Sequence, residues 1–342
     1  MIYYSILIAV ITLIYFFFDK FKNKNMAKKF FSCIICLIVV LFQGFRSFNV
    51  GTDLISYLPS YSKIGYYVTD FHNLTFLNYE PGYVLYNKLL FDFGVTERGF
   101  LIVTASIIQI PIFYMIYKNS KKILLSIFVY FAFSNFIITF SGLRQAIAMG
   151  ICFFAYKFIK EKKIIFYIIT IFFASTFHAS AWFCLIIYPV YYLKLNKKNF
   201  LWTICILFII FVFKSQIVQI SNYLYYGETR ELVNTNAFTM FFMYTILLCI
   251  SFYFNSNDSD FIGLRNILLI ICYIYALASV SNVFIRLSFP LSLYLTILIP
   301  DIVEKINIKP SNMLKEFICF TICIACFFYF IGDLNTLPFS FM

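Results

Sequence analysis

Two carboxylates and a histidine are of the types that accept a proton from a hydroxyl group. His178 lies in the stretch STFHASAW, Asp53 lies in NVGTDLISY, and Glu80 precedes a Pro-Gly pair in NYEPGYVLY. An imidazole or a carboxylate within hydrogen-bond reach of a hydroxyl can act as its general base. Each residue also has a structural explanation. His178 can cap a helix end, and Asp53 can cap a helix that starts at Leu54. Glu80 can be an exposed turn residue or the partner of an arginine.

Arginines form the second group of chemically suited residues, because a guanidinium binds phosphate or carboxylate through paired hydrogen bonds. The stretch SGLRQAIAMG places Arg144 beside Gln145 at the start of an apolar segment. The free N–H groups of a helix N-terminus favour an anion at the same place. A pyrophosphate would suit this position, and so would a carboxylate partner for Arg144. The further arginine candidates for binding an anion are Arg46, Arg286, Arg98 and Arg230.

The composition around these residues is that of a membrane protein. Of 342 residues, 62% are hydrophobic and 12% are charged, and the mean hydropathy is +0.87. A soluble domain carries about 25% charged residues, so lipid must be the solvent for much of this surface. Apolar runs such as SIFVYFAFSNFIITF are continuous, whereas the strands of a membrane barrel alternate. We therefore expect an all-α, polytopic integral membrane protein, with residues 1–342 in a single membrane domain.

About twelve transmembrane helices are predicted when the chain is divided at its charged and turn-rich stretches. The apolar segments lie near residues 2–18, 30–45, 98–117, 123–140, 142–159, 164–177, 179–193, 200–214, 238–254, 266–281, 286–300 and 317–332. Several are shorter than the roughly 20 residues of a perpendicular span. Outer loop regions are expected at about 46–97 and 215–237. The first is rich in Tyr, Asn, Asp and Gly, which favours a position in or on the membrane interface.

The two kinds of basic residue are distributed differently. The lysines fall in short clusters between apolar segments, which explains the formal net charge of +12 without a nucleic-acid partner. With twelve spans these clusters share one face, and the positive-inside rule makes that face cytoplasmic. Of the six arginines, only Arg265 joins them. Arginines at helix ends also snorkel to lipid headgroups, but five on the outer face oppose the topology bias. We interpret them as a set that holds an anionic group.

The ten cysteines do not predict a metal or redox centre. Most lie inside apolar runs, and the CxxC pair Cys33 and Cys36 has no second Cys or His pair beside it. Small buried side chains explain them, so we expect no metal and no cofactor.

Four stretches occur in an order that resembles a known family. They are FRSFNVGTDLISY, YEPGYVLYNKLL, SGLRQAIAMGICFFAYKFI and FHASAWFCLIIYPV, and together they resemble the EpsG family of Wzy-type (O-antigen) polysaccharide polymerases. The motifs cover roughly residues 40–195. The rest of the chain is similar to the family in hydropathy and in the arginine of NVFIRLSFP.

The resemblance implies an inverting glycosyl transfer on the outer face of the bacterial cytoplasmic membrane. The donor would be a growing glycan on undecaprenyl diphosphate and the acceptor a lipid-linked repeat unit, with neither nucleotide sugar nor metal. The implied partners are this lipid-linked oligosaccharide, membrane lipid and a chain-length regulator protein. The residues that would hold the pyrophosphate are Arg46, Arg144 and Arg286, with Gln145 beside it. The base would be His178, Asp53 or Glu80.

Three other functions compete with a polymerase. A ligase that moves the glycan to another acceptor shares the chemistry, but ligases usually have their large outer loop late in the chain. A flippase or other transporter of lipid-linked sugars would place charges at the bilayer midplane and often contains internal repeats. Here the ionisable residues lie at segment ends, and the sequence contains no repeat. A purely structural scaffold explains neither the outward arginines nor His178.

Overall fold

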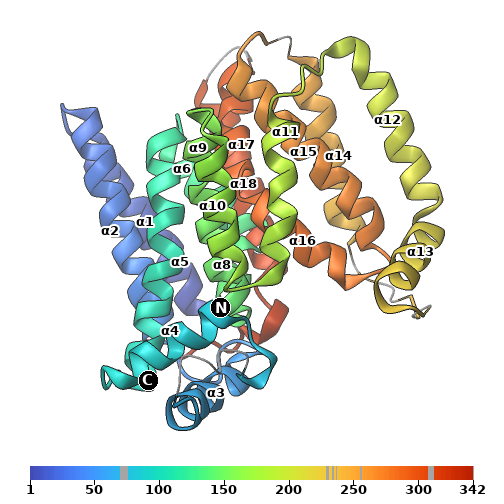
Figure 1. The fold of residues 1–342 in the computed structure, drawn as a ribbon. Coiled ribbons are helices and arrows are strands. Elements are labelled where there is room, and N and C mark those ends of the chain that lie inside the picture. Colours follow the sequence, from blue (N-terminus) through green and yellow to red (C-terminus); the bar gives the residue numbers. More distant parts are fainter. Residues whose placement is uncertain are drawn as a thin grey trace. The chain divides into compact units, whose positions relative to one another are not determined.

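The chain folds into helices, as its continuous apolar runs predict (Figure 1). The computed structural model describes residues 1–69, 76–228, 231–232, 235, 237–254, 256–306 and 312–341. Within these residues the regular structure is helical, and β-pairing is limited to an isolated bridge between Arg46 and Phe341. The prediction of an all-α protein is confirmed.

Two compact units divide the helices, and the short 3-10 helix η2 (Ala179–Ile186) crosses the boundary between them. Unit 1 consists of residues 1–182 and 308–342, and unit 2 consists of residues 183–307. The helices of unit 1 are α1 (Ile2–Asp19), α2 (Lys24–Gly44), α3 (Leu54–Tyr67), η1 (Phe76–Asn78), α4 (Pro81–Asp92), α5 (Glu97–Asn119), α6 (Ile123–Ala132), α7 (Asn135–Ser141), α8 (Leu143–Phe154), α9 (Tyr156–Lys160), α10 (Ile164–Ser175), α18 (Asn312–Phe330) and η3 (Asp333–Asn335). Those of unit 2 are α11 (Ile187–Tyr191), α12 (Lys197–Val212), α13 (Lys214–Tyr226), α14 (Phe238–Tyr253), α15 (Ser259–Ala278), α16 (Asn282–Ser292) and α17 (Leu295–Lys305).

The twelve predicted apolar segments all fall on helices, but several are short or bent. Among the described residues, four helices are long and apolar enough to cross a membrane: α1, α2, α5 and α15. Counting each of three bent pairs as one span raises the number to seven. The break between α6 and α7 bends the chain by 55° at Ser134, whose φ is +61°. The structure therefore supports a helical membrane protein, and the count of twelve spans remains a prediction.

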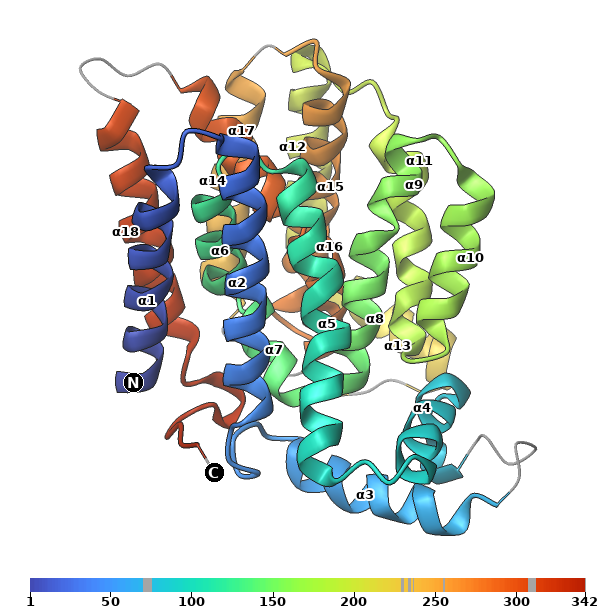
Figure 2. The same ribbon diagram turned by 90° about the vertical axis from the view of Figure 1, so that its left-hand side faces the viewer.

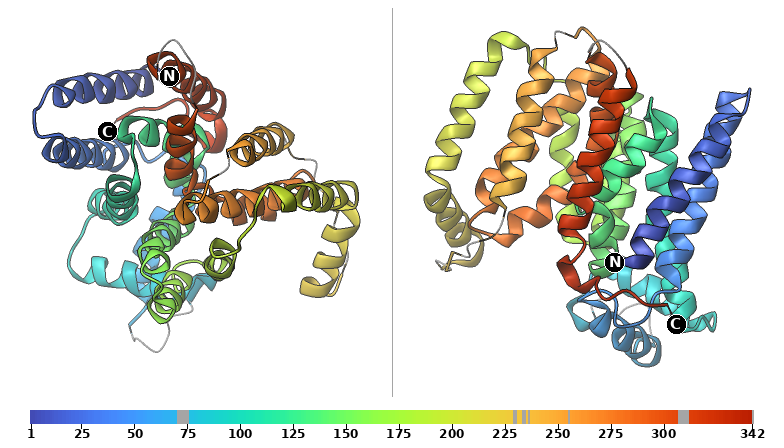
Figure 3. Two further views of the ribbon diagram at one scale, coloured as in Figure 1. Left: turned by 90° about the horizontal axis from the view of Figure 1, so that it is seen from above. Right: turned by 180° about the vertical axis from the view of Figure 1, so that it is seen from behind.

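A polar network lies in the interior of unit 1, where α2 packs along α5 and α5 packs along α8. Gln109 donates to Gln43 Oε1 at 2.9 Å, Tyr130 donates to Gln109 Oε1 at 3.0 Å, and Gln43 donates to Thr139. All four side chains are buried. Such bonds join helices inside lipid, where an unpaired amide is costly. The network therefore links α2, α5, α6 and α7. Helix α18, which is distant from α6 in the sequence, packs along it (Figure 3).

The basic residues separate to the two ends of unit 1. Lys28 Nζ donates to Ser120 O at 2.6 Å, Lys160 Nζ donates to Asn119 Oδ1 at 3.3 Å, and Lys122 pairs with Glu316. These contacts bring the lysine-rich loops together at one end, here called the lysine end (Figure 2). The opposite end, here called the arginine end, carries Arg46, Arg98 and Arg144. Most lysines of unit 1 are thus separated from its arginines, as the sequence predicts, whereas Lys63 on α3 and Lys88 on α4 lie at the arginine end.

The segment 46–97 forms most of the arginine end. Helix α3 begins at Leu54, as expected. Pro81 and Gly82 are the first residues of α4 and not a separate turn before it, and both helices lie across the end of unit 1 (Figure 2). The turn before α3 depends on Gly51, which has a φ of +109°. A Cβ atom there would lie 2.3 Å from Phe140 O. This position therefore requires glycine for both conformation and space.

In unit 2, helix α15 is the buried centre. Asn266 Nδ2 donates to Val190 O at 3.1 Å and to Leu193 O at 2.7 Å, which fixes the end of α11 against α15. Arg265 donates to Leu195 O at 2.5 Å. Arg265 thus lies beside the lysine-containing loop 194–198, as its sequence position predicts. The predicted loop 215–237 begins as a helix, because α13 continues to Tyr226.

The Gly51 turn gives the first prediction. Gly51→Ala should destabilise the protein by at least about 2 kcal/mol, since the new methyl group clashes with a carbonyl and the φ is unfavourable. Gly332→Ala is the matched control, because a Cβ there has no heavy atom within 4 Å. Thermal unfolding in detergent should show a lower melting temperature for Gly51→Ala alone. Equal melting temperatures for the two variants would refute the close packing of this turn.

Candidate functional site

The Glu80 carboxylate joins three segments at the arginine end of unit 1. Its Oε1 accepts hydrogen bonds from the backbone N–H of Ala179 at 3.1 Å and lies 3.1 Å from His178 Nδ1. Its Oε2 accepts from Arg144 Nη1 in an ion pair. The side chains of Glu80, Arg144 and His178 are 19%, 22% and 23% exposed, so all three are shielded but reachable from solvent. The structure thus unites three predicted site residues.

The local backbone around Glu80 explains why its side chain points away from its own helix. Glu80 is the N-cap residue of α4, and its side chain makes no cap hydrogen bond. The first amides of α4, those of Gly82 and Tyr83, donate to Thr176 O at 2.9 and 3.3 Å. A Cβ on Gly82 would lie 2.2 Å from Thr176 Oγ1, so glycine allows this close approach. The start of α4 therefore docks on the end of α10, which frees the Glu80 side chain.

Arg144 is the second residue of α8 and directly follows Gly142-Leu143. The ring of Tyr79 lies 4.5 Å from its guanidinium, and Arg144 also hydrogen-bonds to the Tyr57 hydroxyl. Its Nε is buried and has no hydrogen-bond partner among the described residues. The anion that the structure places beside Arg144 is the Glu80 carboxylate. The alternative of a carboxylate partner, left open by the sequence, is therefore observed.

His178 follows the C-terminus of α10, and its own N–H donates to Ala174 O at 3.2 Å. Its Nδ1 faces Glu80, which accepts but cannot donate when ionised. Nδ1 must therefore carry the proton, and Nε2 of the neutral ring is then an acceptor. The same orientation by a carboxylate prepares the histidine of a serine-protease triad.

The electrostatics favour an ionised Glu80. Burial raises the pKa of its carboxyl, but the hydrogen bond with His178 and the charge of Arg144 lower it by more, to about 2. Glu80 is therefore a carboxylate at any physiological pH. A carboxylate of such low proton affinity is a weak base but a strong hydrogen-bond acceptor.

Three tyrosines surround Arg144 and Glu80. The rings of Tyr57, Tyr79 and Tyr83 lie with centroids 5.4 to 6.3 Å apart, and the Tyr79 hydroxyl is 3.1 Å from Ser60 Oγ. Tyr79 and Tyr83 flank Glu80 in the stretch NYEPGYVLY. Tyr57 and the Ala179 amide were not predicted from the sequence. Tyr57 would have been found from the spacing of Leu54, Tyr57 and Tyr61 on one face of the predicted helix.

Arg46 and Arg98 have structural contacts. Arg46 is 1% exposed, and its three guanidinium nitrogens donate to the backbone carbonyls of Val50, Gln43 and Phe140 at 3.0 to 3.2 Å. Arg98 Nη1 donates to the carbonyls of Gly44 and Arg46. These bonds hold the chain after α2 in place. We therefore leave both arginines out of the site proposed below.

The remaining candidates are separate from the Glu80 cluster or outside the description. Asp53 is exposed at the N-cap of α3 without a side-chain cap bond, so it does not cap the helix in the expected way. Gln145 is buried in α8, one residue from Arg144. Arg286 is exposed on α16 in unit 2. Arg230 and the second histidine, His72, lie outside the described residues.

Comparison with known protein families identifies the EpsG family, which matches residues 29–341. The match extends well beyond the motifs at residues 40–195 and confirms the resemblance. Comparison with curated proteins and with solved structures gave no match.

The contacts of Arg46 and Arg144 predict losses of stability of different size on substitution. Arg46→Gln should lower the stability by about 3 kcal/mol, because it leaves buried carbonyls without a donor. Arg144→Gln should cost about 1 kcal/mol or less, since its ion pair is partly exposed. Thermal unfolding of the two detergent-purified variants measures the difference. An Arg144 variant less stable than the Arg46 variant would contradict these assignments.

The pKa of Glu80 predicts a pH dependence of stability. Because the folded-state pKa of about 2 lies below the ordinary value of 4.5, ionised Glu80 stabilises the fold fully above that value. This contribution is lost as the pH falls toward about 2. The melting temperatures of wild type and Glu80→Gln should therefore differ most near neutral pH and converge in acid. A difference that stays constant down to about pH 3 would show that Glu80 has no lowered pKa.

Proposed function

The chain belongs to the EpsG family, and from this premise we propose that it polymerises polysaccharide repeat units by glycosyl transfer. The donor is a glycan on undecaprenyl diphosphate and the acceptor is a lipid-linked repeat unit, at the outer face of the bacterial cytoplasmic membrane. The observation that carries the proposal is the Glu80 carboxylate, which holds an anion-binding arginine and a histidine together. They lie at the end of unit 1 opposite the lysine-rich loops.

In the proposed reaction, a hydroxyl oxygen of the acceptor attacks the anomeric carbon of the donor. The bond from that carbon to the diphosphate oxygen breaks, and the lipid diphosphate leaves with the electron pair. The hydroxyl proton must move to a base, and the growing negative charge on the leaving group must be balanced. The two side chains bonded to Glu80 match these requirements, because His178 can take the proton and Arg144 can balance the charge.

Arg144 is the proposed partner of the leaving group. Its guanidinium is held by Glu80 on one side and by the Tyr79 ring, 4.5 Å away, on another. A preorganised guanidinium can stabilise phosphate charge without reorganising during the reaction. The diphosphate would compete with Glu80 for Arg144, so the pair would loosen as substrate binds. Tyr79 is half-buried and offers a flat face beside Arg144 on which a sugar ring can stack.

His178 is the proposed general base, and Glu80 is its positioning residue. With Nδ1 protonated and bonded to Glu80, the imidazole presents Nε2 to the acceptor hydroxyl. The resulting imidazolium would be stabilised by the adjacent carboxylate. Glu80 itself is too weak a proton acceptor for this task, because its pKa is about 2. Of the three predicted bases, we therefore retain His178, and Glu80 is the residue that orients it.

A reconstituted assay tests the proposal. Purified protein in liposomes would receive lipid-diphosphate-linked repeat units, and the products would be sized on a gel. Wild type should give a ladder of lipid-linked oligomers. His178→Ala, Glu80→Gln and Arg144→Ala should each reduce the rate by about 100-fold or more. Asp92→Asn is the matched control, because Asp92 is a second ion-paired carboxylate on α4, bonded to Lys88.

A double variant tests whether Glu80 acts by positioning His178. Because Glu80 positions His178, the loss of rate in the double variant Glu80→Gln/His178→Ala should be much smaller than the product of the two single losses. Additive losses would contradict the positioning role. Full activity of His178→Ala would remove it as the base. Movement of the lipid-linked sugar across liposomes without any ladder would replace the polymerase by a flippase.

A further inference from the structure

Helices α2 and α5 lie side by side in unit 1, and a mostly apolar groove of about 610 Å³ runs along them (Figure 2). Both helices are long and apolar enough to cross a membrane. Ser32, Val40 and Phe113 are the buried part of the lining, while Leu37 and Ile110 are each 57% exposed. The groove therefore opens at the surface of unit 1, where lipid tails are the expected neighbours of exposed apolar side chains.

Small side chains make room for this groove. Ser32, Cys33 and Cys36 of α2 line it together with Ser106 of α5, at positions where longer side chains would fill the space. The two helices nonetheless stay in contact there, because Ser32 Oγ donates to Phe113 O at 3.4 Å. Residues three apart share a helix face, so Cys33 and Cys36 together hollow one side of α2. The CxxC pair thus has a consequence for shape.

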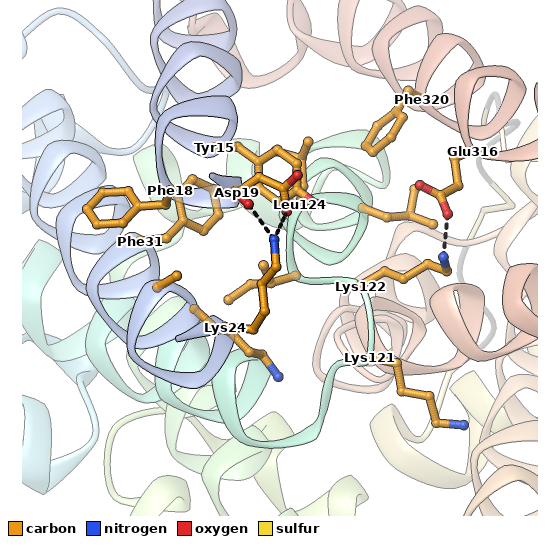
Figure 4. Close-up of a pocket in the computed structure, with 14 residues that line it drawn as sticks. Tyr15, Phe18, Asp19, Lys24, Phe31, Lys121, Lys122, Leu124, Glu316 and Phe320 are labelled. Carbon is orange, nitrogen blue, oxygen red and sulfur yellow. Dashed lines mark hydrogen bonds and ion pairs between the residues drawn. The ribbon is translucent and has the colours of Figure 1, made fainter. Parts of the chain in front are cut away.

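The two ends of the groove differ in charge. Lys29 of α2 and Lys118 of α5 line it at the lysine end, whereas its other end carries no charged residue. Among the described residues of the lining there are two lysines and no carboxylate. A neighbouring cavity between α1, α2, α6 and α18 differs in this respect, because its carboxylates Asp19 and Glu316 each pair with a lysine (Figure 4). The charged end of the groove is complementary to an anion.

Two tyrosines flank the charged end. Nζ of Lys118 lies 5.8 Å from the ring centroid of Tyr114 and 5.5 Å from that of Tyr117. A further ammonium group, that of Lys28, lies 5.6 Å from the Tyr117 ring on its other neighbour helix. Tyrosine rings are enriched at the headgroup level of membranes, and lysines beside them attract anionic headgroups. This end of the groove therefore suits a phosphate at the membrane interface.

The length of the groove fits one acyl chain. Lys29 and Val40 mark its two ends on α2, and at a rise of 1.5 Å per residue they are about 16 Å apart along the helix. One leaflet supplies about 15 Å, which is half of the hydrocarbon core. An acyl chain whose headgroup lies beside the lysines would thus reach the apolar end of the groove near the bilayer midplane. A much longer polyprenyl chain would extend beyond the groove.

We propose that the groove between α2 and α5 binds an anionic phospholipid, with the phosphate at Lys29 and Lys118 and one acyl chain along the groove. The chain would cover apolar surface of both helices, such as Leu37 and Ile110, and would hold α2 against α5. The site is independent of the proposed polymerase reaction, because it shares no residue with the Glu80 cluster.

Native mass spectrometry of the detergent-purified full chain tests the headgroup part of the proposal. The protein would be titrated with dioleoyl-phosphatidylglycerol, with zwitterionic dioleoyl-phosphatidylcholine, and with glycerol phosphate, which has the phosphate ester without the chains. The anionic lipid should bind at least about tenfold more tightly than the other two. Phosphatidylcholine binding equally well would overturn the role of the lysines. Glycerol phosphate binding equally well would overturn the role of the groove.

A pair of double variants localises the binding. Lys29→Gln/Lys118→Gln should weaken binding of phosphatidylglycerol about tenfold or more, since each lysine attracts the phosphate. Lys20→Gln/Lys22→Gln is the control of equal charge change, because both residues are exposed and do not line the groove. Melting temperatures without lipid verify that both variants are folded. The lipid should raise the melting temperature of wild type and control, and much less that of Lys29→Gln/Lys118→Gln. Equal weakening by both double variants would assign the effect to general surface charge and overturn the site.

Photocrosslinking places the acyl chain. Phosphatidylglycerol with a diazirine in one chain would be added at limiting concentration, and the crosslinked peptides would be identified by mass spectrometry. Peptides of α2 and α5 should carry most of the label, and Lys29→Gln/Lys118→Gln should remove most of it. Helix α10 of the same unit is the internal control, because Ile165, Ile169 and Phe172 are exposed apolar residues that do not line the groove. Equal labelling of α10 would mean that the lipid contacts any apolar surface, and would overturn the proposal.

Discussion

The ion pair between Glu80 and Arg144 is the contact on which the arrangement of the arginine end depends. The carboxylate has three donors, from α8, from His178 and from the Ala179 amide at the start of η2. It therefore ties the start of α4 to two helices far away in the sequence. A partly buried carboxylate with three donors is stable, whereas the same carboxylate without Arg144 would face a desolvation cost. The site is thus held together by a negative charge, although the chain is strongly basic.

The two ends of unit 1 use their cations differently. At the arginine end, Arg46 and Arg98 donate hydrogen bonds to backbone carbonyls and thereby stabilise the turn that leads to α3. Arg144 is instead paired with the Glu80 carboxylate, which the substrate anion would replace in the proposed reaction. At the lysine end, lysines and carboxylates line a cavity together with aromatic and aliphatic side chains.

Local features of the sequence predicted much of the fold. Continuous apolar runs predicted the helices, and the polar Gly-Thr-Asp stretch predicted a helix from Leu54. Pro81 and Gly82 do not form a turn before α4 but begin this helix. The break at Ser134 was not predictable, because the stretch FAFSNF contains neither proline nor glycine. Nor could the sequence separate the buried Arg46 from the partly exposed Arg144, since both follow apolar or small residues at the end of a segment. Their difference arises from carbonyls supplied by other segments. The Glu80 cluster joins residues 64 and 98 positions apart, and no sequence period encodes such contacts.

The central claim is tested most directly by measuring which ring nitrogen of His178 carries the proton. Because the chain has two histidines, a His72→Gln variant labelled with ¹⁵N-histidine leaves a single imidazole to observe by NMR. Under conditions in which the ring is neutral, the proton should be on Nδ1, and Glu80→Gln should change the Nδ1 chemical shift. This result would place the hydrogen bond to Glu80 as described and leave Nε2 available as an acceptor. A neutral ring protonated on Nε2 and insensitive to Glu80→Gln would contradict the account.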